Sequence, residues 1–192
     1  LSKNAIEETM IFSKELKEGL EADQDKKSKG MLLTATLTEI NGGTSHNVTP
    51  KECVSTFDVR IPVDTNCKIV EQKISILVNE IAKRRKVEAY YSIIDETEPF
   101  EAPHNSAIVR AFTLGVMDVE HTRPTLIRKT GTGDMNVIGN QWSIPVVTYG
   151  PGDPHEAHTI DEKVSIDEYL RGIEVLKRMI HHLKRLHDKN MQ

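Results

Sequence analysis

The sequence predicts an α/β protein in two parts, an α+β layer over residues 1–95 and an α/β part over residues 96–192. The first part follows the order helix, strand, strand, helix, strand, and the second part alternates strands with helices. Residues 95–103, which join them, are acidic and contain two prolines, as expected of a linker. Alternating strands and helices indicate mostly parallel strands in the second part.

Two helices are predicted in the first part because apolar residues recur there at helical spacing. Residues 2–20 form the first, with Ser2 as the expected N-cap, and residues 66–85 form the second. The polar run over residues 21–29 is expected to be a solvated loop. The residues expected to face the core are Ile6, Met10, Leu16 and Leu20 in the first helix, and Val70, Ile74, Leu77 and Ile81 in the second.

Three strands are predicted in the same part, over residues 31–40, 52–61 and 87–94. The middle one alternates cleanly, which is typical of a strand with one buried face. Together with the two helices, these strands correspond to a ferredoxin-like layer whose first strand would lie before residue 1. One face of the middle strand carries Cys53, Phe57, Val59 and Ile61, and the other carries Val54, Thr56, Asp58 and Arg60.

The second part is predicted to contain three helices and two strands. The helices span residues 104–119, 134–142 and 166–187, and the strands span residues 124–128 and 144–149. The last helix has apolar residues at helical spacing, which predicts its buried face. These residues are Ile166, Leu170, Ile173, Leu176, Ile180 and Leu183.

Composition excludes several classes of function. The chain has 192 residues, a formal net charge of −4 and 38% hydrophobic residues, and it lacks a long basic run, so nucleic-acid binding is not expected. No apolar run approaches the roughly 20 residues that span a bilayer, and residues 1–20 are too charged for a signal peptide. The two cysteines form no disulfide framework, which indicates reduced thiols and a cytoplasmic location.

Because the chain opens on Leu1 rather than Met, we expect Leu1 to be an internal residue of a longer protein.

The segment Lys129–Thr159 holds most of the residues that could carry chemistry. Its turn Gly131–Asp134 joins a predicted strand to a predicted helix, and free N–H groups at such a turn can seat a carboxylate. Thr132, Asp134 and Asn136 are therefore candidate ligand-binding residues. The alternative is a plain glycine-permitted turn with Asp134 as the N-cap, and the two interpretations can coexist.

His158 is the candidate metal ligand, because it follows the predicted strand 144–149 and a Pro-Gly-Asp turn. Loops beyond strand C-termini are where α/β proteins bind ligands, and zinc binds His nitrogen. Asp161 or Glu162 could orient the His158 ring, and His155 is a weaker second candidate. The alternative is an ordinary surface or hydrogen-bonded histidine.

Asn47 and Arg60 are the candidates in the first part. Asn47 follows a Gly-Gly turn, and Arg60 lies on the polar face of the middle strand. Arginine binds carboxylates through two parallel hydrogen bonds, although a single arginine on a strand is commonly just solvated.

Four motifs together resemble the co-catalytic zinc amidohydrolases, which include aminoacylase-like deacetylases, succinyl-diaminopimelate desuccinylase and glutamate carboxypeptidases. They are GG-x-x-x-N-V-x-P (Gly42–Pro50), F-D-V-R-x-P (Phe57–Pro62), K-T-G-T-x-D-M-N (Lys129–Asn136) and Y-G-P-G-x…H-T (Tyr149–Thr159). Within this family the chain is most similar to the branch of LysW-lysine and LysW-ornithine hydrolases, which are also known as acetyl-lysine deacetylases. One departure is Gly133, where that branch usually has Ser.

The resemblance implies a lid or dimerisation domain over residues 1–95 and the C-terminal part of a catalytic domain over residues 96–192. It also implies roles for single residues. His158 matches a metal ligand, and Asn47 and Arg60 match lid residues that reach the substrate carboxylate or scissile carbonyl, often across a dimer interface. Thr132, Asp134 and Asn136 match the turn on the substrate side.

The resemblance further implies two zinc or cobalt ions that activate water. The family's H-x-D motif, bridging Asp and Glu-Glu pair, which supply most metal ligands and the general base, have no counterpart in this sequence. We therefore expect no catalytic general base in this chain and an inactive C-terminal fragment of an active parent.

The function implied for the parent is hydrolysis of the amide that joins an acyl group or a LysW-type carrier protein to lysine or ornithine, in amino-acid biosynthesis. The expected partners are the small conjugate or the carrier, and a second copy that dimerises through the lid. Acetylornithine deacetylase, a carboxypeptidase, or a non-catalytic dimerisation or ligand-binding module remain alternatives.

Overall fold

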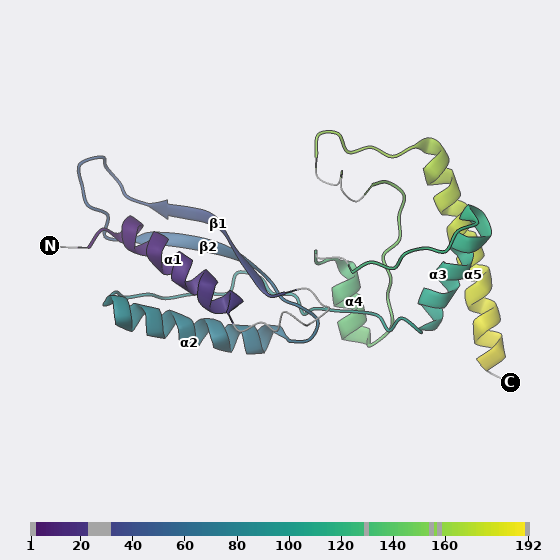
Figure 1. Ribbon diagram of the computed structural model, residues 1–192, viewed down its shortest axis with the longest axis horizontal. Coiled ribbons are helices and arrows are strands. Elements are labelled where there is room, and N and C mark those ends of the chain that lie inside the picture. Colours follow the sequence, from purple (N-terminus) through teal and green to yellow (C-terminus); the bar gives the residue numbers. More distant parts are fainter. Residues whose placement is uncertain (1–2, 23–31, 129–130, 154–155, 157–158, 191–192) are drawn as a thin grey trace. The chain divides into compact units, whose positions relative to one another are not determined.

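The computed structural model describes residues 3–22, 32–128, 131–153, 156 and 159–190 of the 192-residue chain. The chain divides into two compact units, Leu1–Pro99 and Phe100–Gln192 (Figure 1). Within the described residues, no helix has the length and apolar character that crossing a membrane requires.

The first unit consists of two helices and a β-hairpin. Helix α1 spans Ala5–Glu21, strand β1 spans Thr34–Gly42, strand β2 spans Cys53–Arg60, and helix α2 spans Cys67–Arg85. The strands pair antiparallel from Thr34↔Arg60 to Gly42↔Cys53, with an irregularity between Leu37 and Glu39. These elements confirm both predicted helices and the first two predicted strands, although Asn4 caps α1 and the expected cap, Ser2, lies outside the described residues.

The core of the first unit lies between α1, α2 and one face of the hairpin. Phe57, Val59 and Ile61 pack against it, which confirms the predicted inner face of β2. Met10 is 59% exposed, so its predicted core position is wrong. Met10 lies about 120° around the helix from Leu16, beyond the buried stripe, because each residue turns the helix by about 100°. The buried core residues are Leu16, Leu20, Leu33, Ala35, Val70, Val78 and Ile81.

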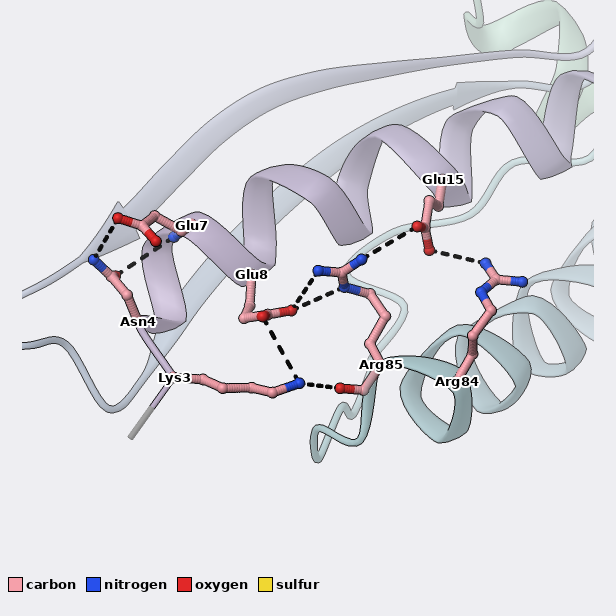
Figure 2. A network of polar contacts seen from close by, with 7 residues as sticks. All are labelled: Lys3, Asn4, Glu7, Glu8, Glu15, Arg84 and Arg85. Atoms are coloured by element: carbon pink, nitrogen blue, oxygen red, sulfur yellow. Dashed lines mark hydrogen bonds and ion pairs between the residues drawn. The ribbon is translucent and has the colours of Figure 1, made fainter. Parts of the chain in front are cut away.

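Polar contacts also hold α1 against α2. The Arg85 guanidinium contacts Glu8 at 2.7 Å and Glu15 at 3.3 Å, and Arg84 contacts Glu15 at 2.9 Å. Figure 2 shows these residues between the two helices, with Lys3 contacting Glu8 and the carbonyl oxygen of Arg85. The two helices are therefore joined by ion pairs as well as by the apolar core.

The C-terminal end of α1 is capped by a cation from α2. The Lys73 ammonium donates hydrogen bonds to the carbonyl oxygens of Leu20 at 2.9 Å and Ala22 at 3.3 Å. The last carbonyls of a helix lack partners within it and carry partial negative charge, so a cation at this place stabilises the helix end.

The predicted strand at residues 87–94 is wrong in this structure. The segment forms neither helix nor strand, although it starts with strand-like alternation, since Val87 and Ala89 are half-buried while Tyr90 is 88% exposed. A strand also requires a neighbouring backbone to pair with. The sheet in the described part of the chain contains only β1 and β2, so residues 87–94 are in no ladder.

The second unit contains helices α3 (Ala107–Glu120), α4 (Asp134–Trp142) and α5 (Ile166–Asn190), which confirms the three predicted helices. Helices α3 and α5 pack tightly, because a Cβ placed on Gly115 of α3 would lie 2.9 Å from the Val175 carbonyl oxygen of α5. The buried hydrophobic residues of the two helices are Val109, Ala111, Val175 and Met179.

Two predictions for the second unit are wrong. Residues 124–128 and 144–149 form neither helix nor strand, and they belong to no sheet in the described part of the chain. The predicted buried face of α5 is also misplaced, since Ile166 is 77% exposed and Ile180 is 63% exposed. Helix α5 has apolar residues on two sides, and the close approach at Gly115 selects the side with Val175 and Met179.

Candidate functional site

The loop that joins β1 to β2 forms an open pocket of about 730 Å³ against the start of α1. Its lining is mainly polar and contains no carboxylate. Because hydroxyl, amide and imidazole groups surround it without negative charge, the pocket suits a ligand with acceptor oxygens. The polar residues in the lining are Asn4, Thr44, Ser45, His46, Asn47 and Thr49.

The loop is held in place by its own backbone and by α1. Gly43 has a φ of 82°, a left-handed conformation that favours glycine. The Ala5 N–H at the start of α1 donates to the Pro50 carbonyl at 3.0 Å, and the Val48 N–H donates to the Ser45 carbonyl at 3.4 Å. These contacts present Asn47 at the tip of a closed turn.

Within this turn the Ser45 hydroxyl donates a hydrogen bond to the Asn47 side-chain oxygen at 2.8 Å. The sequence predicted Asn47 as a candidate but gave no role to Ser45 or to the other pocket residues. The sequence feature that could have indicated this polar pocket is the cluster of hydroxyl and amide side chains over residues 44–49.

Arg60 lies at the other end of the hairpin. Its Nε donates to Asp58 Oδ2 at 2.8 Å, and Nη2 lies 2.8 Å from the same oxygen. Since Gly42 pairs with Cys53 and Thr34 pairs with Arg60, the eight-residue strand β2 separates Arg60 from the loop. A strand of this length spans roughly 25 Å. The first unit therefore does not bring Asn47 and Arg60 into one site.

The turn before α4 holds the three candidates of the second unit. Gly133 is the N-cap and Asp134 is the first helical residue, so the alternative prediction that Asp134 is the N-cap is wrong. Asn136 is buried, and its side-chain oxygen accepts from the Gly133 N–H at 3.2 Å. Thr132 and Asp134 are exposed to solvent.

Asn136 thus helps to cap α4. A polar side chain three residues after the N-cap that reaches back to the cap N–H is half of a capping box. Asn136 lies three residues after Gly133 in the sequence, but the sequence analysis did not predict this capping role.

The segment that leads toward His158 is fixed to α3 and α5. The ring of Tyr149 packs on Phe112 of α3 with centroids 5.4 Å apart, and the Gly152 N–H donates to Glu168 of α5 at 3.0 Å. Burial raises the pKa of the Tyr149 phenol, and the carboxylates of Glu120 and Glu168 add to the rise. The sequence analysis included Tyr149 and Gly152 in a motif but gave no role to Phe112 or Glu168.

A metal centre cannot be built from the described residues. His158, the predicted metal ligand, and His155, the weaker candidate, both lie outside them. Asp161 and Glu162 are exposed in the loop before α5. Within the described ranges, no group of three or more His, Cys, Asp or Glu side chains could hold a metal ion. We therefore derive no reaction step through a metal.

Comparison with known proteins identifies a family for the chain. The sequence model described as Peptidase family M20/M25/M40 matches residues 6–182. A [LysW]-lysine/[LysW]-ornithine hydrolase of Saccharolobus islandicus is 34% identical over 146 residues, which is 76% of this chain and 39% of that protein. A putative [LysW]-lysine/[LysW]-ornithine hydrolase of Thermococcus kodakarensis is 40% identical over 94 residues, covering 49% of this chain and 27% of that protein.

Solved structures share the fold at lower identity. The M20 family metallo-carboxypeptidase Sso-CP2 from Sulfolobus solfataricus aligns over 95% of this chain and 45% of its own, with a TM-score of 0.67 and 17% identity. The di-peptidase Dug1p from Saccharomyces cerevisiae aligns over 80% of this chain and 34% of its own, with a TM-score of 0.66 and 15% identity. The predicted α/β class agrees with these neighbours. The chain spans about two fifths (39%) of the length of the first curated relatives it matches.

Proposed function

Because the chain belongs to peptidase family M20/M25/M40, we propose that it is part of an amidohydrolase that releases lysine or ornithine from an N-acyl or LysW carrier-protein conjugate. The observation that carries the proposal is the 34% identity over 146 residues to a relative named [LysW]-lysine/[LysW]-ornithine hydrolase. The polar pocket at the hairpin loop supports it, because the scissile amide and the substrate carboxylate both offer acceptor oxygens.

In this proposal each candidate residue has a separate task. Asn47 donates a hydrogen bond to a substrate oxygen, and Arg60 pairs with a carboxylate while Asp58 keeps its guanidinium oriented. Thr132 and the first turn of α4, which begins at Asp134, offer a hydroxyl and free N–H groups to an anionic group. Asn136 supports that turn from within as a cap.

The two units would have different roles. We assign residues 1–95 to a lid or dimerisation domain and residues 96–192 to the C-terminal part of a catalytic domain. Strands β1 and β2 each leave an outer edge without a neighbouring strand in the described part of the chain, and such edges favour pairing with a second copy. A homodimer through the first unit, located in the cytoplasm, is the assembly we propose.

The proposed parent enzyme needs a metal, zinc or cobalt, with two ions in the site and His158 as one ligand. Such ions supply Lewis-acid activation of water and of the carbonyl. The tasks assigned above to Asn47, Arg60 and the α4 turn are binding and orientation, and they do not depend on which metal is bound.

The proposal is tested by a substrate panel. The protein expressed from its whole reading frame, supplied with zinc or cobalt, should release lysine from N-acetyl-lysine and from a LysW-lysine conjugate. His158→Ala should abolish release, whereas His187→Ala should retain it, because His187 is an exposed residue of α5. Preferential release from N-acetyl-ornithine or from a dipeptide would favour a deacetylase or a carboxypeptidase instead. Hydrolysis that is unchanged in His158→Ala would overturn the proposal.

Binding by the 192-residue chain gives a second test. Arg60→Gln should weaken binding of N-acetyl-lysine by roughly 10-fold or more, since a charge-assisted hydrogen bond contributes about 1.5–3 kcal/mol. Arg123→Gln, a matched change at another exposed arginine, should leave the affinity unchanged. Equal affinities for the two variants would remove Arg60 from the site.

A further inference from the structure

The side-chain amide of Asn47 is hydrogen-bonded through its oxygen and not through its nitrogen among the described residues. Its oxygen accepts the Ser45 hydroxyl at 2.8 Å. Among the described residues, its amide nitrogen has no hydrogen-bond acceptor. Because an amide offers one acceptor group and one donor group, engaging the oxygen leaves the nitrogen for a ligand.

The rest of the pocket favours the same kind of ligand. Thr44 and Thr49 add hydroxyl groups and His46 adds an imidazole, whereas no Asp or Glu lines the pocket. A ligand cation would find no negative charge there. A carboxylate or a carbonyl oxygen would find donors on several sides.

The backbone hydrogen bonds around Ser45 fix the position of the turn that carries its hydroxyl. The Ser45 carbonyl closes the turn by accepting the Val48 N–H at 3.4 Å, and the Pro50 carbonyl ties the end of the loop to Ala5. A hydroxyl on a closed turn can hold a neighbouring amide in one orientation. Without it, ligand binding must also freeze the rotation of the Asn47 side chain, which costs affinity.

We propose that Ser45 is a positioning residue: its hydroxyl holds the Asn47 amide so that the nitrogen faces the substrate oxygen that the proposed function places in the hairpin-loop pocket. The inference rests on the proposed function insofar as Asn47 contacts the substrate. Ser45 itself acts only through Asn47.

The positioning role can be measured on the full chain without any ligand. In ¹⁵N relaxation experiments, Ser45→Ala should increase the motion of the Asn47 side-chain NH₂ group, because the hydrogen bond to its oxygen is lost. Ser45→Thr keeps a hydroxyl and should restore the order. Ser92→Ala is a matched control at an exposed serine outside the pocket and should have no effect. Equal order of the Asn47 amide in Ser45→Ala and Ser45→Thr would overturn the inference.

The subsite is tested by titrating the same chains with Nα-acetyl-lysine, acetate and methylammonium. Nα-acetyl-lysine and acetate should shift the Asn47 NH₂ signals, and Ser45→Ala should weaken their binding roughly three- to tenfold, the range expected for one hydrogen bond. Ser45→Thr and Ser92→Ala should stay within about twofold of the unaltered chain. A response of Asn47 to methylammonium and not to acetate would show that the amide faces the other way and would overturn the inference.

The hydrolysis panel separates this inference from the proposed function. Ser45-dependent binding of acetate in a protein that releases no lysine would support the inference and overturn the proposed function. Release of lysine that is equally fast in Ser45→Ala and Ser45→Thr would overturn the inference and leave the proposed function standing.

Discussion

The thiol of Cys67 shows how burial can override the effect of a helix end. Cys67 is the first residue of α2, a position where the helix dipole favours the thiolate. Burial nevertheless raises its pKa from 9.0 to about 11, and the negative charge of Glu98 adds to the rise. Glu98 also accepts the Cys67 N–H at 3.1 Å, which keeps that carboxylate beside the thiol.

Cys67 should therefore be a slow nucleophile in the folded chain. With a pKa of about 11, the thiolate fraction at pH 8 is about a hundredfold lower than with a pKa of 9.0, because each unit of pKa changes it tenfold. In a Cys53→Ser background, alkylation by iodoacetamide at pH 8 should be about a hundredfold slower than in the urea-unfolded chain.

Glu98→Gln is the diagnostic change for this prediction. Glutamine keeps an acceptor for the Cys67 N–H but removes the charge, so the pKa of Cys67 should fall and alkylation should become severalfold faster. Glu88→Gln, at an exposed position, is the matched control. Folded and unfolded chains that react at the same rate would contradict the assignment of the raised pKa to burial.

The raised pKa of Cys67 should make the free energy of unfolding decrease at alkaline pH. Between about pH 9 and 11 the unfolded chain has lost the Cys67 proton while the folded chain still holds it, so unfolding releases a proton. The contribution of Cys67 is therefore fully present below pH 9 and is lost as the pH rises toward 11.

At the scale of elements, the packing of α3 on α5 depends on the absence of a side chain at Gly115. A Cβ there would meet the Val175 carbonyl oxygen at 2.9 Å and the Met179 nitrogen at 3.0 Å. Both are backbone atoms, so a rotamer change cannot relieve the overlap. Gly115→Ala must push the two helices apart.

Gly115→Ala should lower the stability of the second unit by about 1–3 kcal/mol, the usual cost of overpacking. The gain of roughly 1 kcal/mol that alanine brings to a helix interior offsets only part of that cost. Hydrogen exchange of the α3 and α5 amides measures the change. Gly150→Ala is the control, because nothing lies within 4 Å of its added Cβ, and protection that is equal in the two variants would contradict the close contact.

The ion pairs between α1 and α2 should differ in value because they differ in exposure. The Arg85 side chain is 19% exposed and contacts both Glu8 and Glu15, whereas the Arg84 side chain is 64% exposed and, among the described residues, contacts Glu15 alone (Figure 2). Arg85→Gln should destabilise the first unit more than Arg84→Gln does, because it removes the nearest partner of Glu8 and the second partner of Glu15. Arg84→Gln, the matched change, should cost less than about 1 kcal/mol.

The acid dependence of the first unit has a definite sign. The hydrogen bond from Arg84 lowers the pKa of Glu15 below 4.5, and the charge of Arg85 lowers it further. A carboxyl with a depressed pKa in the folded state stabilises the fold above its unfolded pKa, and this contribution is lost as the pH falls through the folded value. Urea unfolding at pH 7 and pH 3 should therefore show a smaller loss of stability on acidification in Arg84→Gln than in the unaltered chain.

At the scale of the whole molecule, the helices were predictable and three of the five strands were not found. A helix is set by local spacing, which is why residues 134–142 were predicted with their observed bounds. A strand needs a partner that its own residues do not specify, and residues 87–94, 124–128 and 144–149 have the composition of strands without a described partner. The prediction of the buried face of α5 was wrong for the same reason, because that face is determined by the contact with Gly115 of α3.

The candidate site followed the same division. Asn47 and the turn before α4 could be predicted as candidates because turn chemistry is local. Ser45 and Glu168 were missed because their importance lies in what they contact, Asn47 Oδ1 and the Gly152 N–H, and spacing alone does not show such contacts. The capping role of Asn136 was local and could have been predicted.

The two units should lose their cores independently. Leu20 is 1% exposed within the core of the first unit, and Val175 is 0% exposed between the helices of the second. Leu20→Ala should lower the protection of amides in α1 and α2 by about 2–5 kcal/mol, the usual cost of removing a buried leucine side chain. It should leave the amides of α3 and α5 unchanged, and Val175→Ala should do the reverse. Because sites without shared partners act additively, the double variant should show the sum of both effects in hydrogen exchange. If Leu20→Ala also reduced protection in α3 and α5, the two units would unfold as one.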